Sequence, residues 1–337
     1  MLNAVKADSN RYAFWCDMKL VNFLGGHIPF GPCVLGLGTF DGFHLGHREL
    51  VRRMVSRARE LQLPAVLFTF DLPPKKILDP QNFPGALTLP EEKFQLLLES
   101  GVDWVVFRTF DKQFAVTYSQ EFVRRILAEK LQAREVFVGF NFGFGFNREG
   151  TADSLATDLH ELGIGCQILP RVSIDGVTIS STFIREQIKS GNLDQATKWL
   201  GRPVTLTGTV IHGEKRGRQM GFPTANLSLE HPVKVLPPHG VYDTIADTPF
   251  GSYQAMTNIG VRPTFARHTP LLEAHLLGFN GDLYSQTIRV RFYRRLREER
   301  CFPSMESLIA QMKCDLEEVR TSSMTRRGHP RDMGQSS

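Results

Sequence analysis

The sequence predicts two folded domains of different class: a doubly wound α/β domain, followed by a mostly antiparallel β-barrel or sandwich closed by one helix. Three observations predict this. The chain has 337 residues, enough for about two domains of ordinary size. Short apolar runs alternate with helical patterns over residues 33–200. After residue 200, β-branched and aromatic runs follow one another with Gly- and Pro-rich segments and no helix between them.

Apolar runs in the first part are continuous, which is typical of strands buried on both faces of a parallel sheet. The predicted strands are Cys33–Gly38, Ala65–Phe70, Val102–Phe107, Glu135–Phe140 and Ile164–Leu169. The predicted helices between them are Arg48–Gln62, Glu91–Glu99, Gln120–Leu131 and Ala152–Leu162. Because ligands of such sheets bind at the carboxyl ends of the strands, the chemistry is expected in the turns that follow the strands.

The second part contains a different set of elements. Its predicted strands are Val204–His212, Val241–Asp247, Tyr253–Asn258, Glu273–Leu277 and Gln286–Phe292, and its closing helix is Ser304–Arg320. The chain is therefore divided into an N-terminal extension (1–32), the α/β domain (33–190), the β domain (191–321) and a tail (322–337). The tail is expected to be disordered, because it has almost no apolar residues.

Composition narrows the class of protein. With 42% apolar and 22% charged residues the chain is an ordinary globular protein, and its net charge of +5 is too small to indicate nucleic-acid binding. No apolar run approaches the roughly 20 residues of a membrane helix. We expect no secretory signal, because Asp8 and Asp17 interrupt the first 20 residues and no continuous apolar region stands there. The five cysteines form no CxxC pair. We therefore expect reduced thiols, no zinc site and a cytoplasmic location.

The first chemical signal is the run Gly38–His47, GTFDGFHLGH, which ends a strand and opens a helix. Glycines allow the backbone to approach a phosphate closely, and a helix N-terminus supplies oriented N–H groups. His44 and His47 stand three residues apart, so both can donate to a polyphosphate from one side of the helix. A metal pair, or two surface histidines without a shared task, is the alternative.

Two further segments of the α/β domain carry polar groups at strand ends. Ile179–Arg185, ISSTFIR, enters a helix after the last strand. Its hydroxyls are either simple helix caps or, together with Arg185, a clamp for a triphosphate. Val138–Asn147, VGFNFGFGFN, runs from a strand into a loop of glycines and aromatic residues. It is either a plain loop or a surface that suits a planar ring.

In the β domain the run Gly213–Asn226, GEKRGRQMGFPTAN, contains a cationic, glycine-rich loop. It either folds over phosphates or is an exposed basic hairpin turn. Thr224 and Asn226 offer neutral oxygen donors of the kind that Mg²⁺ accepts beside phosphate oxygens. Glu273, near the start of a predicted strand, is the candidate general base, although a single strand glutamate is more often a solvated side chain.

These motifs resemble those of the bacterial bifunctional riboflavin kinase/FAD synthetase family. The similarity extends from about residue 33 to residue 320 and rests on GxFDGxHxGH at Gly38–His47, ISSTxIR at Ile179–Arg185 and GFPTAN at Gly221–Asn226. The runs NIGVRPTF at Asn258–Phe265 and GDLY at Gly281–Tyr284 add to it. The resemblance implies a Rossmann-like nucleotidyltransferase domain and a riboflavin-kinase β-barrel.

The resemblance also implies two reactions. The barrel would transfer a phosphoryl group from ATP to riboflavin to give FMN, and the α/β domain would transfer AMP from ATP to FMN to give FAD and pyrophosphate. Carried over by motif, the nucleotide-binding residues for adenylylation are Gly38, Phe40, His44, His47, Ser181 and Arg185, with Asn141 near the reacting phosphate. The kinase residues are Gly213 and Gly217 for the nucleotide, Thr224 and Asn226 for Mg²⁺-ATP, Glu273 as the base and Arg297 beside the flavin.

Two positions depart from the family pattern. The usual Thr-Phe-Asp-Pro-His-Pro after the second strand is replaced by TFDLPP at Thr69–Pro74, which lacks the histidine. Gly278 stands where the family has an acidic residue shortly after the base. The first departure is expected to affect how FMN is placed in the adenylylation site. The second is expected to affect the flavin or metal geometry in the kinase site.

Other hypotheses remain at this stage. Only one domain, most plausibly the kinase, could be active, or the protein could be a flavin- or nucleotide-binding regulator without turnover. A nucleic-acid module, suggested by the arginines at 289, 291, 294, 295 and 297, is disfavoured by the adjacent Glu298 and Glu299. We expect riboflavin, FMN and ATP as partners, no nucleic acid, no membrane, and a monomer or weak homo-oligomer.

Overall fold

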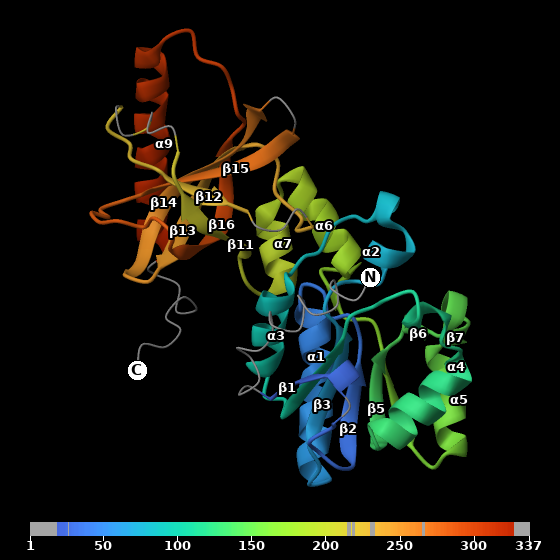
Figure 1. Ribbon diagram of the computed structural model, residues 1–337. Helices are drawn as coiled ribbons and strands as arrows, with labels where there is room; N and C mark the ends of the chain where they lie inside the picture. Colours follow the sequence, from blue (N-terminus) through green and yellow to red (C-terminus); the bar gives the residue numbers. More distant parts are fainter. Residues whose placement is uncertain are drawn as a thin grey trace. The chain divides into compact units, whose positions relative to one another are not determined.

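The structure is a computed structural model in which residues 19–326 are described, apart from Gly26, 214–216, 218–219, 230–232 and 265–266. It contains two compact units, the first ending at Phe183 and the second beginning at Ile184 (Figure 1). The predicted fold class is confirmed. The basic residues of the predicted cationic loop, Lys215, Arg216 and Arg218, and the end of the predicted tail, residues 327–337, lie outside the described residues.

The N-terminal unit is built on a six-stranded sheet in the order β1-β4-β3-β2-β5-β8, with all neighbours parallel. The strands are β1 (Leu20–Asn22), β2 (Cys33–Leu37), β3 (Ala65–Phe70), β4 (Trp104–Arg108), β5 (Ala133–Gly139) and β8 (Gly165–Leu169). Successive strands proceed from β2 toward one edge and from β5 toward the other. The order therefore reverses between β2 and β5, and the site is expected beyond their carboxyl ends.

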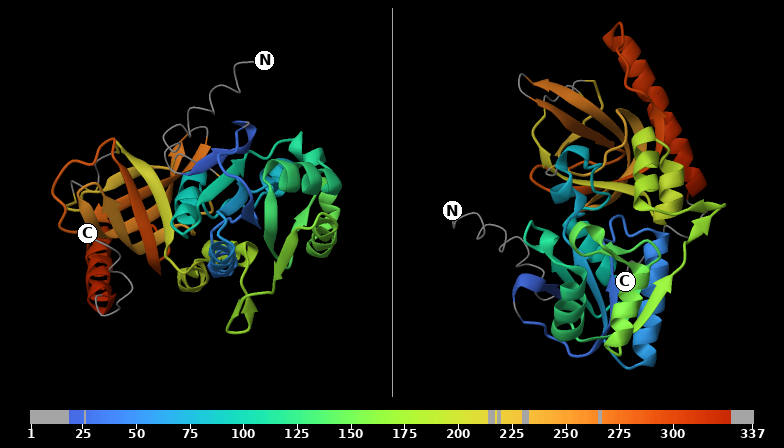
Figure 2. Two further views of the ribbon diagram at one scale, coloured as in Figure 1. Left: turned by 90° about the horizontal axis from the view of Figure 1, so that it is seen from below. Right: turned by 90° about the vertical axis from the view of Figure 1, so that its right-hand side faces the viewer.

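Helices cover both faces of this sheet, as Figures 1 and 2 show. The main helices are α1 (Leu45–Glu60), α3 (Pro90–Leu98), α4 (Ser119–Glu121), which continues as the π-helix η5 (Phe122–Lys130), and α5 (Ala152–Glu161). Apolar side chains of α1 and α3 pack on one face of the sheet, and those of η5 and α5 pack on the other. Two apolar cores flank the sheet, which explains why its strands lack polar alternation.

Short elements occupy the loops of this unit. They are α2 (Lys75–Leu78), the 3-10 turns η2 (Phe23–Gly25), η3 (Pro80–Asn82), η4 (Phe114–Val116) and η6 (Phe146–Arg148), and two antiparallel pairs, β6 (Gly143–Phe144) with β7 (Gly150–Thr151) and β9 (Ser173–Ile174) with β10 (Val177–Thr178). Part of the predicted N-terminal extension is structured, since β1 extends the parallel sheet beside β4. A strand of three residues is too short to leave a periodic signal.

The C-terminal unit begins with the last turns of α6 (Ser181–Ser190) and with α7 (Leu193–Leu200). A closed antiparallel barrel follows in the order β11-β12-β15-β14-β13-β16. The strands are β11 (Val204–Ile211), β12 (Ala225–Ser228), β13 (Gly240–Thr248), β14 (Gly251–Thr264), β15 (Arg267–Leu276) and β16 (Thr287–Arg297). Pairing of β11 with β16 closes the barrel, which settles the predicted choice of barrel or sandwich.

The closing helix α9 (Met305–Arg326) packs on the outside of the barrel (Figure 2). Val319 is fully buried there beside Val241 and Met256. The Ser322 hydroxyl donates to the carboxylate of buried Asp243. The helix therefore continues into the predicted disordered tail, because its last turns still find partners on the barrel.

Candidate functional sites

The turn after β2 has a conformation that few sequences tolerate. Phe40, Gly42 and Phe43 all have positive φ, at 46°, 81° and 37°. The Phe40 ring is buried against Gly38, so that residue's contribution to a ligand would come from its main chain. A buried carboxylate holds the turn: Asp41 accepts hydrogen bonds from the backbone N–H groups of Leu87 (2.9 Å) and Thr88 (3.1 Å). These hydrogen bonds of the Asp41 carboxylate therefore fix the conformation of the glycine turn.

His44 and His47 lie together where this turn becomes α1. His44 is the N-cap of the helix, and its Nδ1 accepts a hydrogen bond from the main-chain N–H of His47 at 3.3 Å. The two imidazole rings stack, with centroids 3.6 Å apart and planes 14° from parallel. A side chain at Gly46 would press on the His44 ring, since its Cβ would lie 3.2 Å from ring atoms. The helix N-terminus and both rings therefore present donors in one place.

A hydrogen bond connects the second motif to the first. The Ser181 hydroxyl, at the start of α6, donates to the main-chain oxygen of Asp41 at 2.8 Å. The structure therefore brings ISST and GTFDG together, as a shared site requires. Arg185 follows one turn along α6 and is buried.

Asn141 follows β5, the strand beside β2 across the point where the strand order reverses. It is exposed, and the N–H of Phe142 donates to the Gly139 carbonyl at 3.0 Å to close the turn. Two aromatic rings of this loop pack within the unit. The centroids of the stacked Phe142 and Phe144 rings are 5.7 Å apart, and the Phe144 ring packs on Phe122 of η5.

One residue that the sequence analysis missed also supports this site. Lys93 of α3 is 1% exposed, and its Nζ donates to three main-chain oxygens, those of Thr39 (3.3 Å), Phe70 and Asp71 (3.0 Å). A signal existed: Lys93 falls on the buried stripe of α3 with Pro90, Phe94 and Leu97. A lysine on an apolar helical stripe indicates a buried cation with partners.

The barrel residues are brought together by strand pairing. Asn226 of β12 stands opposite Glu273 of β15, and Glu273 stands opposite Asn258 of β14. Directly opposite residues share a face of the sheet. Glu273 alternates with fully buried Leu272 and Ala274, so this polar row lies on the outer face of the barrel. Within the row Asn226 is almost fully buried and Glu273 is half-buried.

The glycine-rich loop contacts this row. A Cβ on Gly213 would lie 2.4 Å from the Asn226 side chain, and one on Gly217 would lie 3.3 Å from the Thr224 hydroxyl. Both glycines are therefore needed for the close approach of the loop to Thr224 and Asn226. One cluster beside Glu273 thus contains the four residues that are predicted to bind the nucleotide and Mg²⁺: Gly213, Gly217, Thr224 and Asn226.

Arg297 is held by the fold. Val241 pairs with Asn258 on one side and Arg297 on the other, which brings Arg297 into the same row around the barrel. Its Nε donates to the Asp315 carboxylate of α9 at 2.8 Å, and Asp315 is 3% exposed. The neighbouring arginines are also paired, Arg291 with Asp247 (2.8 Å) and Arg294 with Glu318 (2.7 Å).

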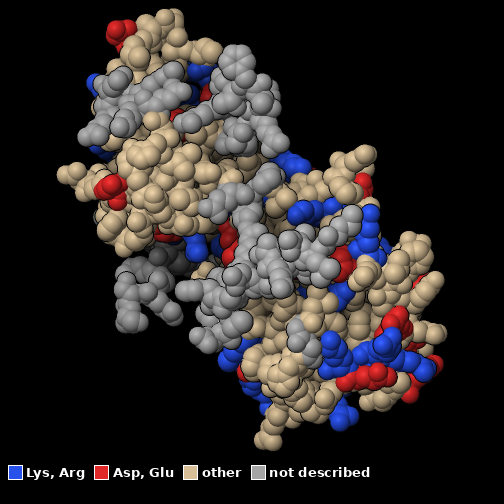
Figure 3. All heavy atoms as spheres, in the orientation of Figure 1, with Lys and Arg blue, Asp and Glu red and all other residues tan. Residues whose placement is uncertain are grey.

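Charges elsewhere are mixed in sign. Figure 3 shows Lys and Arg side chains of the N-terminal unit interspersed with Asp and Glu, and Arg125 is paired with Glu121 at 2.8 Å. The charges on this face, like those of the paired arginines of the barrel, are therefore of both signs. Of the helices in the described part of the chain, none is both long and apolar enough to cross a membrane.

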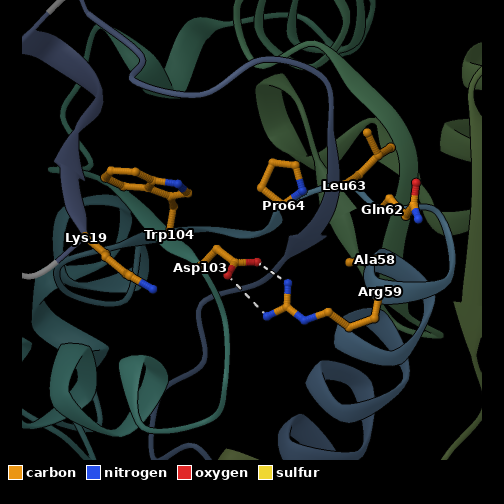
Figure 4. A pocket seen from close by; sticks show the side chains of 8 residues that line it. All are labelled: Lys19, Ala58, Arg59, Gln62, Leu63, Pro64, Asp103 and Trp104. Carbon is orange, nitrogen blue, oxygen red and sulfur yellow. Dashed lines mark hydrogen bonds and ion pairs between the residues drawn. The ribbon is translucent and has the colours of Figure 1, made fainter.

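A hollow of about 390 Å³ opens at the opposite end of the sheet from the candidate site, at the amino ends of β3 and β4 (Figure 4). Its lining residues are Lys19, Ala58, Arg59, Gln62, Leu63, Pro64, Asp103 and Trp104. A bidentate ion pair crosses it, with Arg59 nitrogens 2.6 and 3.1 Å from the Asp103 oxygens. None of the predicted site residues lines it, so it is separate from the candidate sites.

Comparison with known proteins identifies a family domain in each of the two units. The family model for FAD synthetase matches residues 29–183, and that for riboflavin kinase matches residues 200–323. A bifunctional riboflavin kinase/FMN adenylyltransferase from Pseudomonas fluorescens is 37% identical over 86% of this chain and 92% of its own length. The corresponding protein of Escherichia coli is 36% identical over 88% and 96%, respectively.

A solved structure is similar as well. A crystal structure described as a macrolide-efflux protein from Streptococcus pneumoniae superposes with a TM-score of 0.82 at 33% sequence identity. The match covers 90% of this chain and 99% of that one. The likeness therefore includes both the α/β unit and the barrel.

Proposed function

Because this chain belongs to the family of bifunctional riboflavin kinases/FMN adenylyltransferases, we propose that each of its two units carries one of two ATP-dependent reactions. The protein is a bifunctional enzyme of flavin cofactor synthesis that phosphorylates riboflavin to FMN and adenylylates FMN to FAD. The observation that carries this conclusion is that both family domains are present in one chain and each has its own cluster of motif residues.

In the adenylylation reaction the FMN phosphate attacks the α-phosphorus of ATP, and pyrophosphate leaves. The nucleophile is already an anion and needs no general base, so the site must mainly position the reactants and stabilise negative charge. We assign that task to His44, His47 and the N-terminal turn of α1, supported by their stacking on one helix end. Ser181 ties α6 to the turn, and Arg185 and Asn141 complete the predicted phosphate contacts.

In the kinase reaction the 5′-hydroxyl of riboflavin attacks the γ-phosphorus of ATP, and ADP leaves. A neutral hydroxyl must lose its proton, and Glu273 is the carboxylate that we assign as base. Its half-buried position in the polar row beside Asn226 supports this role. The loop at Gly213 and Gly217 would hold the nucleotide. Arg297 would act near the flavin as a residue fixed by Asp315.

A Mg²⁺ ion would bind with the nucleotide at Thr224 and Asn226. The donors fit, because both offer neutral oxygen ligands and a carboxylate stands opposite Asn226. In the described part of the chain no group of three or more His, Cys, Asp or Glu side chains could hold a metal alone. Phosphate oxygens of ATP would be the further ligands, and the ion would supply positive charge at the transferred phosphoryl group.

The remaining expectations concern the surroundings of the enzyme. We infer a cytoplasmic location, supported by Cys33, Cys166, Cys301 and Cys314, which are free thiols. Riboflavin, FMN and ATP are its substrates, and we expect a monomer or weak homo-oligomer that binds no nucleic acid. Cell fractionation tests the location, and light scattering tests the oligomeric state.

One incubation tests the proposed function. The purified full chain is mixed with riboflavin, ATP and Mg²⁺, and FMN and FAD are separated by chromatography. Both products are expected, and omission of Mg²⁺ should stop both reactions. FMN alone would indicate that the adenylyltransferase unit is inactive, and binding without either product would indicate a regulator.

A further inference from the structure

The buried lysine of α3 has no part in the two reactions as assigned above. Its nitrogen lies among three main-chain oxygens, from Thr39 in the turn after β2 and from Phe70 and Asp71 at the end of β3. The Thr69 hydroxyl donates to the same Thr39 oxygen at 3.2 Å. Since β2 and β3 are neighbours in the sheet, Lys93 spans two adjacent strand ends.

The two turns joined in this way have different tasks. The turn after β2 leads into His44 and His47, and the turn after β3 contains the Leu72-Pro73-Pro74 departure from the family pattern. Three uncharged carbonyl oxygens around one ammonium are a strong, directional cradle, because each accepts from a different N–H of the charged amine. Removal of the amine would take the charged donor from all three oxygens and leave the Thr39 oxygen with the Thr69 hydroxyl, which does not connect the turn after β2 to Asp71.

We propose that Lys93 is a positioning residue for adenylylation: its ammonium fixes the phosphate-binding turn 38–44 relative to the turn 71–74, and so aligns the two substrates. The proposal rests on the proposed function of this unit. Lys93 touches neither substrate in this scheme. It acts through the backbone of the two turns, on which the alignment of nucleophile and phosphorus depends.

The charge state of Lys93 supplies a specific signature. Burial lowers its pKa from the ordinary 10.5 to about 8, while the charges that face it, Asp41 from the first turn and Asp71 from the second, act in the opposite direction. As pH rises through about 8, the amine loses a proton and can no longer donate to all three oxygens. Adenylylation should therefore decline above that pH.

This decline is distinguishable from unfolding. Between pH 8 and 10.5 the unfolded chain keeps the proton that the folded chain has lost. The unfolded state then binds more protons, so this group makes folding more favourable as the pH rises. Loss of activity in that window would come from loss of alignment and not from unfolding caused by Lys93.

The test uses the full chain, supplied FMN and ATP, and two variants. Lys93→Met keeps the length and removes the donors, and its kcat for FAD formation is expected to fall about tenfold to hundredfold, with a smaller change in KM. The decline above pH 8 should disappear in this variant. Lys93→Arg keeps a cation of higher pKa, so it should recover part of the rate and move the decline to higher pH.

A matched control is available in the same unit. Lys130 also donates to a main-chain oxygen, that of Phe23 at 3.2 Å, but it lies at the end of η5. Lys130→Met should leave both kcat and the pH profile unchanged. Riboflavin phosphorylation, measured in every sample, reports on the barrel, and thermal unfolding reports on the fold.

Two results would overturn the proposal. One is a Lys93→Met enzyme with the rate and pH profile of the wild type, or with a lower melting temperature as its single change. The other is a wild-type adenylylation rate without a decline above pH 8, which is decisive even if the variant fails to fold. A wild-type chain that forms no FAD would instead contradict the proposed function itself.

Discussion

The two candidate sites are built in different ways. In the α/β unit the candidate residues stand on turns and on the helices that these turns open, and the turn after β2 is fixed from outside, since Asp41 accepts from the N–H groups of Leu87 and Thr88. In the barrel, Asn226 and Glu273 stand on adjacent strands, and the sheet hydrogen bonds themselves fix their separation. A turn needs dedicated supporting residues, whereas a strand position is supported by its whole sheet.

The largest effect is expected from loss of the base in the barrel. Glu273→Gln preserves the shape of the side chain but cannot accept the riboflavin proton, so FMN formation should fall on the order of a thousandfold. Conversion of added FMN to FAD should continue at the wild-type rate. Asn226→Ala should show the same selectivity through loss of a Mg²⁺ ligand. Failure of the Glu273→Gln chain to adenylylate added FMN would show that the two sites depend on each other.

A smaller effect, in the other reaction, is expected at the end of α1. His44→Ala or His47→Ala should slow FAD formation about a hundredfold by removing a donor to the developing charge. His44 is also the N-cap, so His44→Asn, which keeps a capping oxygen, separates the two roles. An Asn variant as active as the wild type would mean that His44 only caps the helix. FMN formation should persist in all three variants.

A change of a few-fold is expected in the turn after β3. This turn lacks the family histidine, so FMN is expected to bind weakly, and Pro73→His should lower the KM for FMN. The main-chain oxygen of Pro73, which accepts from the N–H of Lys76, is retained in the variant, so α2 should persist. An unchanged KM in steady-state kinetics would show that the turn does not contact FMN.

The smallest effect is expected from removal of the whole N-terminal unit. A fragment of residues 181–326 keeps the barrel, α9, and α7, which packs on β11 and β16. It should phosphorylate riboflavin at the full-length rate, because every predicted kinase residue lies within it. The check is FMN formation together with a cooperative thermal transition. A folded but inactive fragment would refute independent sites.

Much of the fold could be predicted because its signals are local. The strand Ala65–Phe70 was predicted with the observed bounds, and α1, α5 and β11 differ by a few residues at most. The short strands β1 and β12 were missed, since three or four residues among glycines and prolines carry no period. Strands β14 and β15 extend well beyond their predicted ends, because each is completed by pairing with the other.

In the candidate sites, too, local motifs could be predicted from the sequence and long-range contacts could not. The residue types of GTFDGFH alone predict a phosphate-binding turn, so His44 and His47 could be predicted as site residues from the sequence. The partners that hold the turn, Thr88 and Lys93, are about fifty residues away and come close only when α3 packs against the sheet. The pairing of Arg297 with Asp315 likewise depends on where α9 lies on the barrel. Sequence spacing does not encode such contacts.

The polar row of the barrel has a consequence for how this enzyme can change over evolutionary time. Asn226, Glu273 and Asn258 face the same side only because three strands keep one register. Deletion of a single residue within β12 would turn Asn226 toward the apolar interior and bring Leu227 to the surface. Length variation is therefore tolerable in the loops between strands but not within them. Descendants of this chain in which one of these three strands has changed in length are therefore expected to have lost the kinase reaction.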